Sequence, residues 1–224
     1  MSKIIIIQAR QNSTRFPNKV LQYINGIPVI EIIIKRLIKS KKVDQIVVAT
    51  SRSKKNNDLV KVLKTKGYNV FQGSENNVLN RYIKAAEKYS ADTIIRVTAD
   101  CPLVDPSMLD KMIDVYDKNK CDLVTNVYPP TFPDGYDLEI FRLKSLKKLN
   151  TLTKDIYDRE HVTSYFYKSK KFNIINFSNK IDLSLKRLTL DEKNDLKLIK
   201  IIFNKFKPNI HFKFSDVAKM IKKK

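Results

Sequence analysis

The sequence predicts an α/β fold in which a mostly parallel sheet is covered by helices on both faces. Two observations lead to this prediction: short apolar segments alternate with segments of helical periodicity, and the first apolar segment, residues 4–7, is an unbroken run of isoleucine. Strands that are buried on both faces have continuous apolar runs, and parallel neighbours need crossover helices. In such a sheet, ligands bind beyond the carboxyl ends of the strands.

The first half of the chain follows this alternation closely. Residues 28–39 have apolar side chains at helical spacing, and Pro28 suits the first turn of that helix. Further strands are expected at residues 45–50, 69–71 and 93–98, and further helices at residues 58–66 and 78–89. Because parallel strands end at one edge of a sheet, we expect Arg10, Ser51 and Asp100 to lie along that edge.

The second half of the chain is less regular. Helices are expected at residues 107–119, 143–152, 158–167, 196–206 and 215–221, and strands at residues 122–126, 138–141, 172–177 and 187–190. Ser107 is a candidate N-cap, and residues 222–224 are expected to fray. Since no linker divides the sequence, we predict one domain over residues 1–224, in which approximately residues 123–180 form a substrate lobe.

Composition excludes several classes of protein. A chain of 224 residues with 42% hydrophobic content can bury a sizeable core. The net charge of +21 would suit nucleic acid, but the lysines are scattered along the whole sequence, so we interpret them mainly as solvated surface and keep nucleic-acid binding as the weaker alternative. The sequence shows no secretory signal, no apolar run near the ~20 residues that cross a bilayer, and no paired cysteine motif at Cys101 or Cys121. A cytoplasmic protein with reduced thiols is expected.

Polar and basic side chains follow the first strand directly. They are Gln8, Arg10, Ser13, Thr14, Arg15 and Lys19. Arginine offers a planar fork to phosphate oxygens and lysine a mobile charge, so a nucleoside triphosphate is the natural ligand. The four glycines cannot form a Walker A loop or a G-x-G-x-x-G turn, so side chains must hold the phosphates. The alternative is a solvated basic loop.

Two aspartates follow predicted strands. Asp100 comes after residues 93–98, and Asp191 comes after residues 187–190. Carboxylates at the ends of neighbouring strands can converge, and Mg²⁺ takes one or two carboxylates together with substrate phosphates. The alternative is that each aspartate caps the helix after it.

Several motifs resemble one enzyme family. The run Q-A-R-x-x-S-T-R-x-P-x-K at residues 8–19, followed by N-G-I-P at residues 25–28, resembles the opening of the cytidylyltransferases that make CMP-activated sugar acids, and most closely the branch named after spore coat polysaccharide biosynthesis protein F. The similarity continues at residues 77–86, 96–106, 133–141, 158–162 and 187–199, nearly the whole chain. Asn12 and Asn18 stand where the family usually has glycine, and Ile27 where it has lysine. Asparagine tolerates the left-handed backbone that glycine would permit.

The resemblance implies a three-layer α/β/α nucleotidyltransferase fold, Rossmann-like, with a small lobe for substrate binding and dimerisation. It implies an Mg²⁺-dependent transfer of CMP from CTP to the anomeric hydroxyl of a sugar acid, with release of pyrophosphate, for surface polysaccharide biosynthesis. A homodimer is also implied. The alternatives are a nucleotidyltransferase acting on a sugar phosphate, a GT-A-like glycosyltransferase, and a relative that has lost activity.

The resemblance also implies roles for individual residues. The nucleotide would be bound by Ala9, Arg10, Ser13, Thr14, Arg15, Lys19 and Arg81. Catalysis would depend on Asp100, Lys19 and Arg10, and the metal would be held by Asp100 and Asp191. A sugar acid needs several hydrogen-bonding groups and one cation, and the candidates are Asn126, Tyr128, Asp134, Asp137, Glu139, Arg159 and His161. Arg159 is the candidate for the cation that binds the carboxylate.

Overall fold

The computed structural model describes residues 2–222 and is built on a seven-stranded sheet in the order β5-β4-β1-β6-β8-β7-β9. The strands are β1 (Lys3–Gln8), β4 (Gln45–Ser51), β5 (Asn69–Gly73), β6 (Thr93–Thr98), β7 (Leu123–Thr125), β8 (Glu139–Arg142) and β9 (Ile174–Asn176). Strand β8 is antiparallel to both of its neighbours, and the other pairs are parallel. The predicted mostly parallel sheet is confirmed.

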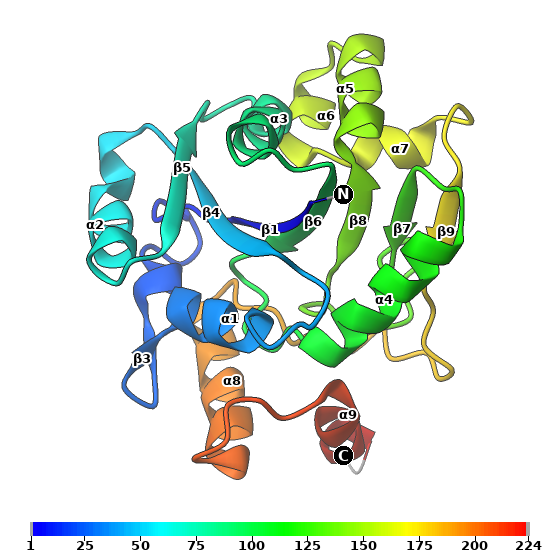
Figure 1. The fold of residues 1–224 in the computed structure, drawn as a ribbon. Coiled ribbons are helices and arrows are strands. Elements are labelled where there is room, and N and C mark those ends of the chain that lie inside the picture. The colour runs from blue at the N-terminus through cyan, green and yellow to red at the C-terminus, as the bar shows by residue number, and fades with distance from the viewer. Residues whose placement is uncertain (1, 223–224) are drawn as a thin grey trace.

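Helices cover both faces of the sheet (Figure 1). One face packs against α1 (Val29–Leu37), α4 (Pro106–Lys118), α8 (Lys193–Phe206) and α9 (Phe214–Lys222), and also takes side chains from α2 (Asn57–Thr65). The other face packs against α3 (Val78–Lys88), α5 (Leu143–Leu152) and α7 (Ser164–Lys168), with α6 (Ile156–His161) beside α3. The short elements are η1 (Lys19–Leu21), η2 (Lys54–Asn56) and the β2 (Tyr23–Ile24)–β3 (Ile27–Pro28) hairpin.

The isoleucine run explains why β1 lies in the centre. Ile5 and Ile7 point into one apolar core, whereas Ile4 and Ile6 point into the other, and all four are fully buried. Because successive side chains of a strand point to opposite faces, only a continuous apolar run can fill both cores. Beyond Ile7 the polar loop begins, so the strand ends at the edge where the site lies.

Several predicted elements were wrong in detail. Helix α4 begins at Pro106 and is capped by Asp105, whose Oδ1 accepts from Ser107 N at 2.8 Å, so Ser107 is not the N-cap. Residues 158–167 form parts of two helices, because Val162 has φ 59° and interrupts the helical backbone. Residues 187–190 are not a strand; the segment makes a single bridge at Arg187. Pro28 ends β3 and precedes α1.

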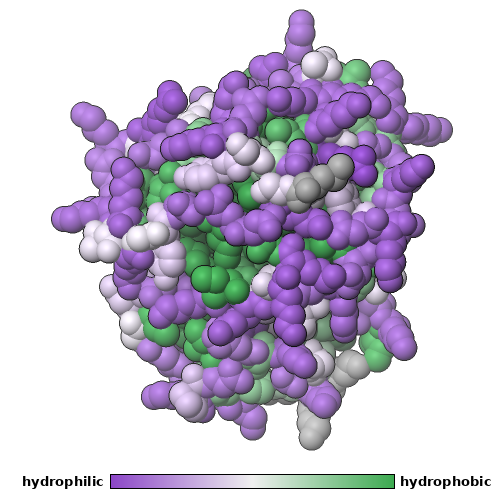
Figure 2. Space-filling view, in the orientation of Figure 1, coloured by the Kyte–Doolittle hydropathy of each residue, from purple (hydrophilic) through white to green (hydrophobic). Residues whose placement is uncertain are grey.

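The ends and the surface complete the description. Helix α9 extends to Lys222, so the part of the expected fraying that concerns residues 223–224 lies outside the described residues. Within residues 2–222, no helix combines the length and the apolar character that spanning a bilayer requires. Hydrophilic side chains spread over most of the face in Figure 2, with smaller hydrophobic areas between them.

Candidate active site

A polar cleft of about 230 Å³ opens where β1, β4 and β6 end. Gln8, Ser51 and Thr98, the last residues of these three strands, line it. Nine of the residues predicted to bind the nucleotide, the metal or the sugar acid line this cleft together. They are Arg10, Ser13, Thr14, Arg15, Lys19, Arg81, Asp100, His161 and Asp191. The predicted alignment of residues 10, 51 and 100 along one edge is confirmed.

The loop after β1 is held in place by its own backbone and by two amide side chains. Gln11 N donates to Asn56 Oδ1 at 2.8 Å, and Asn56 Nδ2 donates to Ser51 Oγ at 2.7 Å. The other end of the loop turns back at Asn18, which has φ 60° and whose N–H donates to Gln11 O at 3.0 Å. Asparagine thus adopts the left-handed backbone there, as expected. Gln11 and Asn56, which no motif in the sequence indicated, hold the loop through these hydrogen bonds, and Asn56 also lines the cleft.

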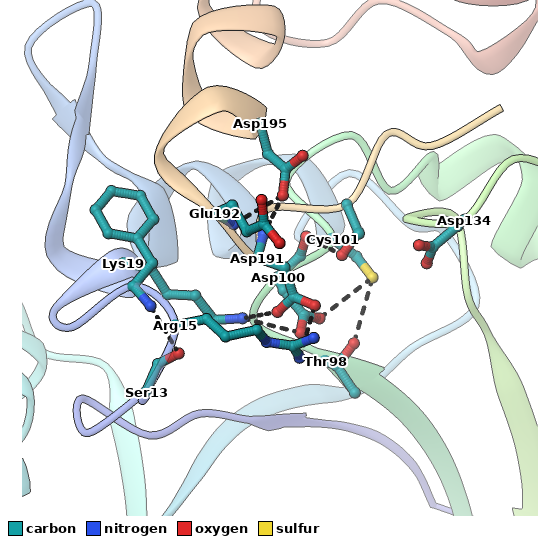
Figure 3. A network of polar contacts seen from close by, with 12 residues as sticks. Ser13, Arg15, Lys19, Thr98, Asp100, Cys101, Asp134, Asp191, Glu192 and Asp195 are labelled. Atoms are coloured by element: carbon teal, nitrogen blue, oxygen red, sulfur yellow. Dashed lines mark hydrogen bonds and ion pairs between the residues drawn. The ribbon is translucent and has the colours of Figure 1, made fainter.

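Lys19 stands at the centre of the site (Figure 3). Its Nζ contacts Asp100 Oδ2 at 3.2 Å and Asp191 Oδ1 at 2.7 Å, and only 9% of its side chain is exposed. Arg15 Nη2 contacts the second oxygen of Asp191 at 2.8 Å. Burial alone would raise the pKa of Asp191, but Lys19, Arg15 and Arg187 outweigh it and hold that pKa below its usual value. Asp191 is therefore ionised at neutral pH.

Asp191 reaches Asp100 through the backbone that precedes it. Leu190 N donates to Asp100 O at 2.8 Å, and Leu188 N donates to Asp134 O at 2.8 Å. The close approach requires Gly135, which has φ +105° and where a Cβ atom would lie 2.5 Å from the Leu188 carbonyl. Only glycine fits both the backbone conformation and the space.

The capping alternative for the two aspartates was wrong. The N-cap of α8 is Glu192, which forms a capping box with Asp195. Asp191 instead donates its own N–H to Asp195 Oδ2 at 2.8 Å. Helix α4, the next helix after Asp100, is capped by Asp105. Both carboxylates are therefore free of capping and turned toward the cleft.

The two carboxylates fit a divalent cation that is completed by phosphates. They contact the same ammonium nitrogen, so they lie close enough to share one cation. The part of the chain that the structure describes has no group of three or more His, Cys, Asp or Glu side chains placed to hold a metal. Mg²⁺ commonly uses only one or two carboxylates beside substrate phosphates, and the neighbouring Arg10, Ser13 and Arg15 suit such phosphates.

Most of the predicted sugar-acid residues do not line the cleft. Asn126 is used internally, because it donates to Tyr136 O and accepts from Leu138 N, both at 2.8 Å. Tyr128 is exposed and stacks on Tyr167. Ala9, which was expected near the base, is 2% exposed and donates to Ala49 O.

The acidic and basic candidates differ in their surroundings. Asp134 pairs with Arg187 at 3.3 Å. Burial and the neighbouring Asp134 carboxylate raise the pKa of Asp137 to about 7. Arg159 is half-buried outside the cleft, whereas His161 lines it and stacks on Tyr157.

The cleft also contains polar residues that the sequence analysis gave no role, chiefly Glu75, Arg96 and Thr98. Arg96 and Thr98 lie two residues apart on β6 and face the same side of the sheet. Their period-2 spacing from Asp100 was the signal that could have found them. The cleft thus has one cationic loop, the Asp100–Asp191 pair, two further carboxylates at Glu75 and Glu160, and polar side chains on β6.

Comparison with known proteins gives a consistent result. A family model described as cytidylyltransferase matches residues 4–212. The spore coat polysaccharide biosynthesis protein SpsF of Bacillus subtilis is 33% identical over 210 residues, 90% of this chain and 86% of that protein. A 3-deoxy-manno-octulosonate cytidylyltransferase of Nitratiruptor is 37% identical over 114 residues, 49% of this chain and 45% of that protein. The structure of a cytidylyltransferase from Leptospira borgpetersenii has a TM-score of 0.95 and 34% identity, covering 100% of this chain and 94% of that chain.

Proposed function

The chain belongs to the cytidylyltransferase family of nucleotidyltransferases, and on that premise we propose that it transfers CMP from CTP to the anomeric hydroxyl of a sugar acid in surface polysaccharide biosynthesis. The observation that carries the proposal is the contact of Lys19 with both Asp100 and Asp191 beneath a cationic loop. A site for a metal-bound triphosphate needs this combination of charges. The sugar-acid acceptor is supported by the name of the Nitratiruptor relative, and the polysaccharide by the name of SpsF.

In the proposed reaction the anomeric oxygen attacks the α-phosphorus of CTP in line. The bond from that phosphorus to the bridging oxygen breaks and pyrophosphate leaves, while the hydroxyl proton passes to the Asp100 carboxylate and from there to water. Arg10, Arg15 and Lys19 neutralise the phosphates, with Ser13 and Thr14 as hydrogen-bond donors and Arg81 beside the nucleotide. Positioning and charge neutralisation supply most of the catalysis in such transfers.

Asp100 and Asp191 would hold Mg²⁺, which would supply charge neutralisation on the phosphates when bound. The proposed ligand set needs no third protein carboxylate, because substrate phosphates would complete it. Acceptor binding is assigned to the β6 side of the cleft and to residues 123–180. The pairing of two copies stays a prediction.

Thermal denaturation with each nucleoside triphosphate, with and without Mg²⁺, tests the nucleotide. A ligand at ~100 times its dissociation constant stabilises by about 2.7 kcal/mol, which raises the melting temperature measurably. We expect the largest Mg²⁺-dependent shift with CTP, followed by pyrophosphate release when a sugar acid is added. A larger shift with UTP, GTP or dTTP would contradict the assignment of cytosine as the base. Turnover of a sugar 1-phosphate instead of a sugar acid would contradict the proposed acceptor class.

The metal assignment is tested on the same assay with Asp100→Asn and Asp191→Asn. Because electrostatic stabilisation of the transition state is lost, each variant should lower kcat by about 10²- to 10³-fold. Asp182→Asn, at an exposed carboxylate outside the cleft, is the matched control and should retain wild-type turnover. Wild-type rates in both cleft variants would refute the assignment.

A further inference from the structure

Arg96 is a cleft residue without a role in the nucleotide and metal sites. It lies on β6, two residues before Thr98 and on the same face of the sheet. Its side chain lines the cleft and is 16% exposed. Arginine is rarely buried to this extent unless it is paired. The partner of Arg96 and its unpaired donors therefore indicate what the side chain does.

Glu139 explains how Arg96 is held. The two residues are opposite each other in the β6–β8 pair, and Arg96 Nη1 donates to Glu139 Oε2. Glu139 also accepts from Thr163 Oγ1 at 3.1 Å and from the Tyr167 hydroxyl. Both of its oxygens are thus used, and only 2% of its side chain is exposed. Glu139, one of the predicted sugar-acid ligands, fixes the arginine instead of facing the cleft.

Part of the Arg96 guanidinium is left without a protein partner. Within residues 2–222, the buried Nε of Arg96 has no hydrogen-bond acceptor, and the buried Oε1 of the neighbouring cleft residue Gln8 has no donor. The Nε atoms of Arg81 and Arg159 also lack acceptors, so the position of Arg96 beside Glu139 in the cleft is what distinguishes it. Unpaired buried polar atoms are costly and call for an explanation, such as a ligand. Because Nη1 contacts Glu139 and Nε is buried, the part of the guanidinium that lines the cleft remains for an acceptor, and carboxylate is an acceptor that guanidinium binds strongly.

We propose that Arg96 binds the carboxylate of the acceptor sugar acid, with Glu139 as its positioning residue. This inference rests on the proposed function, because it assigns the acceptor side of the same cleft. In this role Arg96 takes the place of Arg159, which is the cation predicted from the sequence and which lies outside the cleft.

Three other cations of the cleft have contacts of their own, and Arg10 belongs to the loop that follows β1. Lys19 and Arg15 contact Asp191. Arg81 packs against Gly73 at the end of β5 and donates to Ser74 O at 2.8 Å, on the opposite side of β1 from β6. Arg96 is the arginine on the β6 side, where His161 also lines the cleft.

Calorimetry on the wild-type protein with Mg²⁺ and a CTP analogue whose α–β bridge is methylene measures acceptor binding without turnover. The probes are 3-deoxy-manno-octulosonate and N-acetylneuraminate, each compared with its C1 carboxamide. Because a charge-assisted hydrogen bond is lost with the amide, the wild type should prefer the better-bound acid by about 10- to 100-fold. The affinity for the CTP analogue is recorded in the same experiment.

Arg96→Lys retains the charge but loses the fork, and it should reduce the preference for the acid to within about 3-fold. A variant that lacked only the arginine could misfold, because Glu139 would be left as an unpaired buried carboxylate. The double variant Arg96→Gln/Glu139→Gln removes both charges and avoids this problem. It should lose the preference equally. Binding of the CTP analogue should change little in both variants. Arg142→Gln, an exposed arginine on β8, is the matched control and should keep the wild-type preference.

The outcomes separate the inference from the proposed function. If the wild type prefers the acid and both Arg96 variants keep that preference, the inference is wrong and the proposed function stands. Loss of the preference in Arg159→Gln, but not in Arg96→Lys, would return the role to Arg159. If the wild type binds the CTP analogue but shows no preference for either acid, the sugar-acid function fails and the inference fails with it.

Discussion

At the scale of single residues, the arrangement of the two aspartates in the cleft depends on Lys19. Its ammonium holds together two carboxylates, which are 29% and 15% exposed. Like charges at this separation repel, and burial strengthens the repulsion. A divalent cation held by the two carboxylates would supply this positive charge, so the ammonium would be free to move to the phosphates of a nucleotide bound with it. Lys19 is therefore expected to contribute to stability as well as to phosphate binding.

Lys19→Met tests this dual role by thermal denaturation. Without metal, the free energy of unfolding of the variant should be about 1–3 kcal/mol lower than that of the wild type. The decrease is smaller than for a fully buried ion pair because both carboxylates are partly exposed. Millimolar Mg²⁺ should recover more stability in the variant than in the wild type. Lys42→Met removes an exposed partner of Asp114 and serves as the control, with little expected change. Equal stability of variant and wild type without metal would contradict the interpretation.

At the scale of elements, the junction between α6 and α7 positions His161 at the cleft. Asp158 is buried there and accepts from Thr153 Oγ1 at 2.9 Å, Ser164 Oγ at 2.6 Å and Lys168 Nζ at 2.8 Å. Burial would raise the pKa of Asp158, but these three donors outweigh it, and the pKa lies below its usual value. The carboxylate thus joins the end of α5 to both short helices.

Asp158→Asn should lower stability at pH 7 by about 1–3 kcal/mol, because an amide cannot satisfy the same donors. The folded-state pKa is below the unfolded value, near 4, so the contribution of the ionised carboxylate is fully present above that value. It is lost as the pH falls through the folded-state pKa. Urea unfolding from pH 7 to pH 3 should therefore show the difference from wild type shrinking toward acid pH. A difference that stays constant with pH would rule out this origin, and Asp117→Asn at the surface gives the baseline.

The sequence predicted those parts of the fold that local pattern determines. The isoleucine run and the alternation of strands and helices located β1, β4, β5 and β6. The pattern of each of these strands lies within its own residues and does not depend on distant parts of the chain. The loop of residues 8–19 and Asp100 followed, since they directly continue strands. The path of residues 188–190 is different, because it depends on hydrogen bonds to Asp100 and Asp134, although the alternation of polar and apolar residues there predicted a strand.

The Arg96–Glu139 pair could not be predicted for a related reason. It exists because β8 is inserted antiparallel between β6 and β7, although β7 precedes β8 in the sequence. Strand order is a property of the whole sheet, and the sequence pattern of Glu139 is compatible with an exposed ligand. Its burial decides instead that it holds an arginine.

At the scale of the whole molecule, the net charge of +21 has two possible uses: attraction of an anionic nucleotide or retention of a nucleic acid. The cleft gathers Arg10, Arg15 and Lys19 with Arg81 and Arg96, but it also contains Asp100, Asp191, Glu75 and Glu160. A volume of about 230 Å³ suits a small molecule rather than a duplex.

We therefore expect the charge to accelerate nucleotide association without giving tight binding of nucleic acid. A salt titration from 50 to 200 mM, with fluorescent CTP in one series and a duplex oligonucleotide in the other, measures both. Nucleotide association should slow as screening increases, since steering acts over about one Debye length. Duplex binding should weaken to the micromolar range or beyond at physiological salt, as non-specific contacts do. Nanomolar duplex affinity under those conditions would show that the positive surface serves a macromolecular partner, and the cleft would then explain only part of the charge.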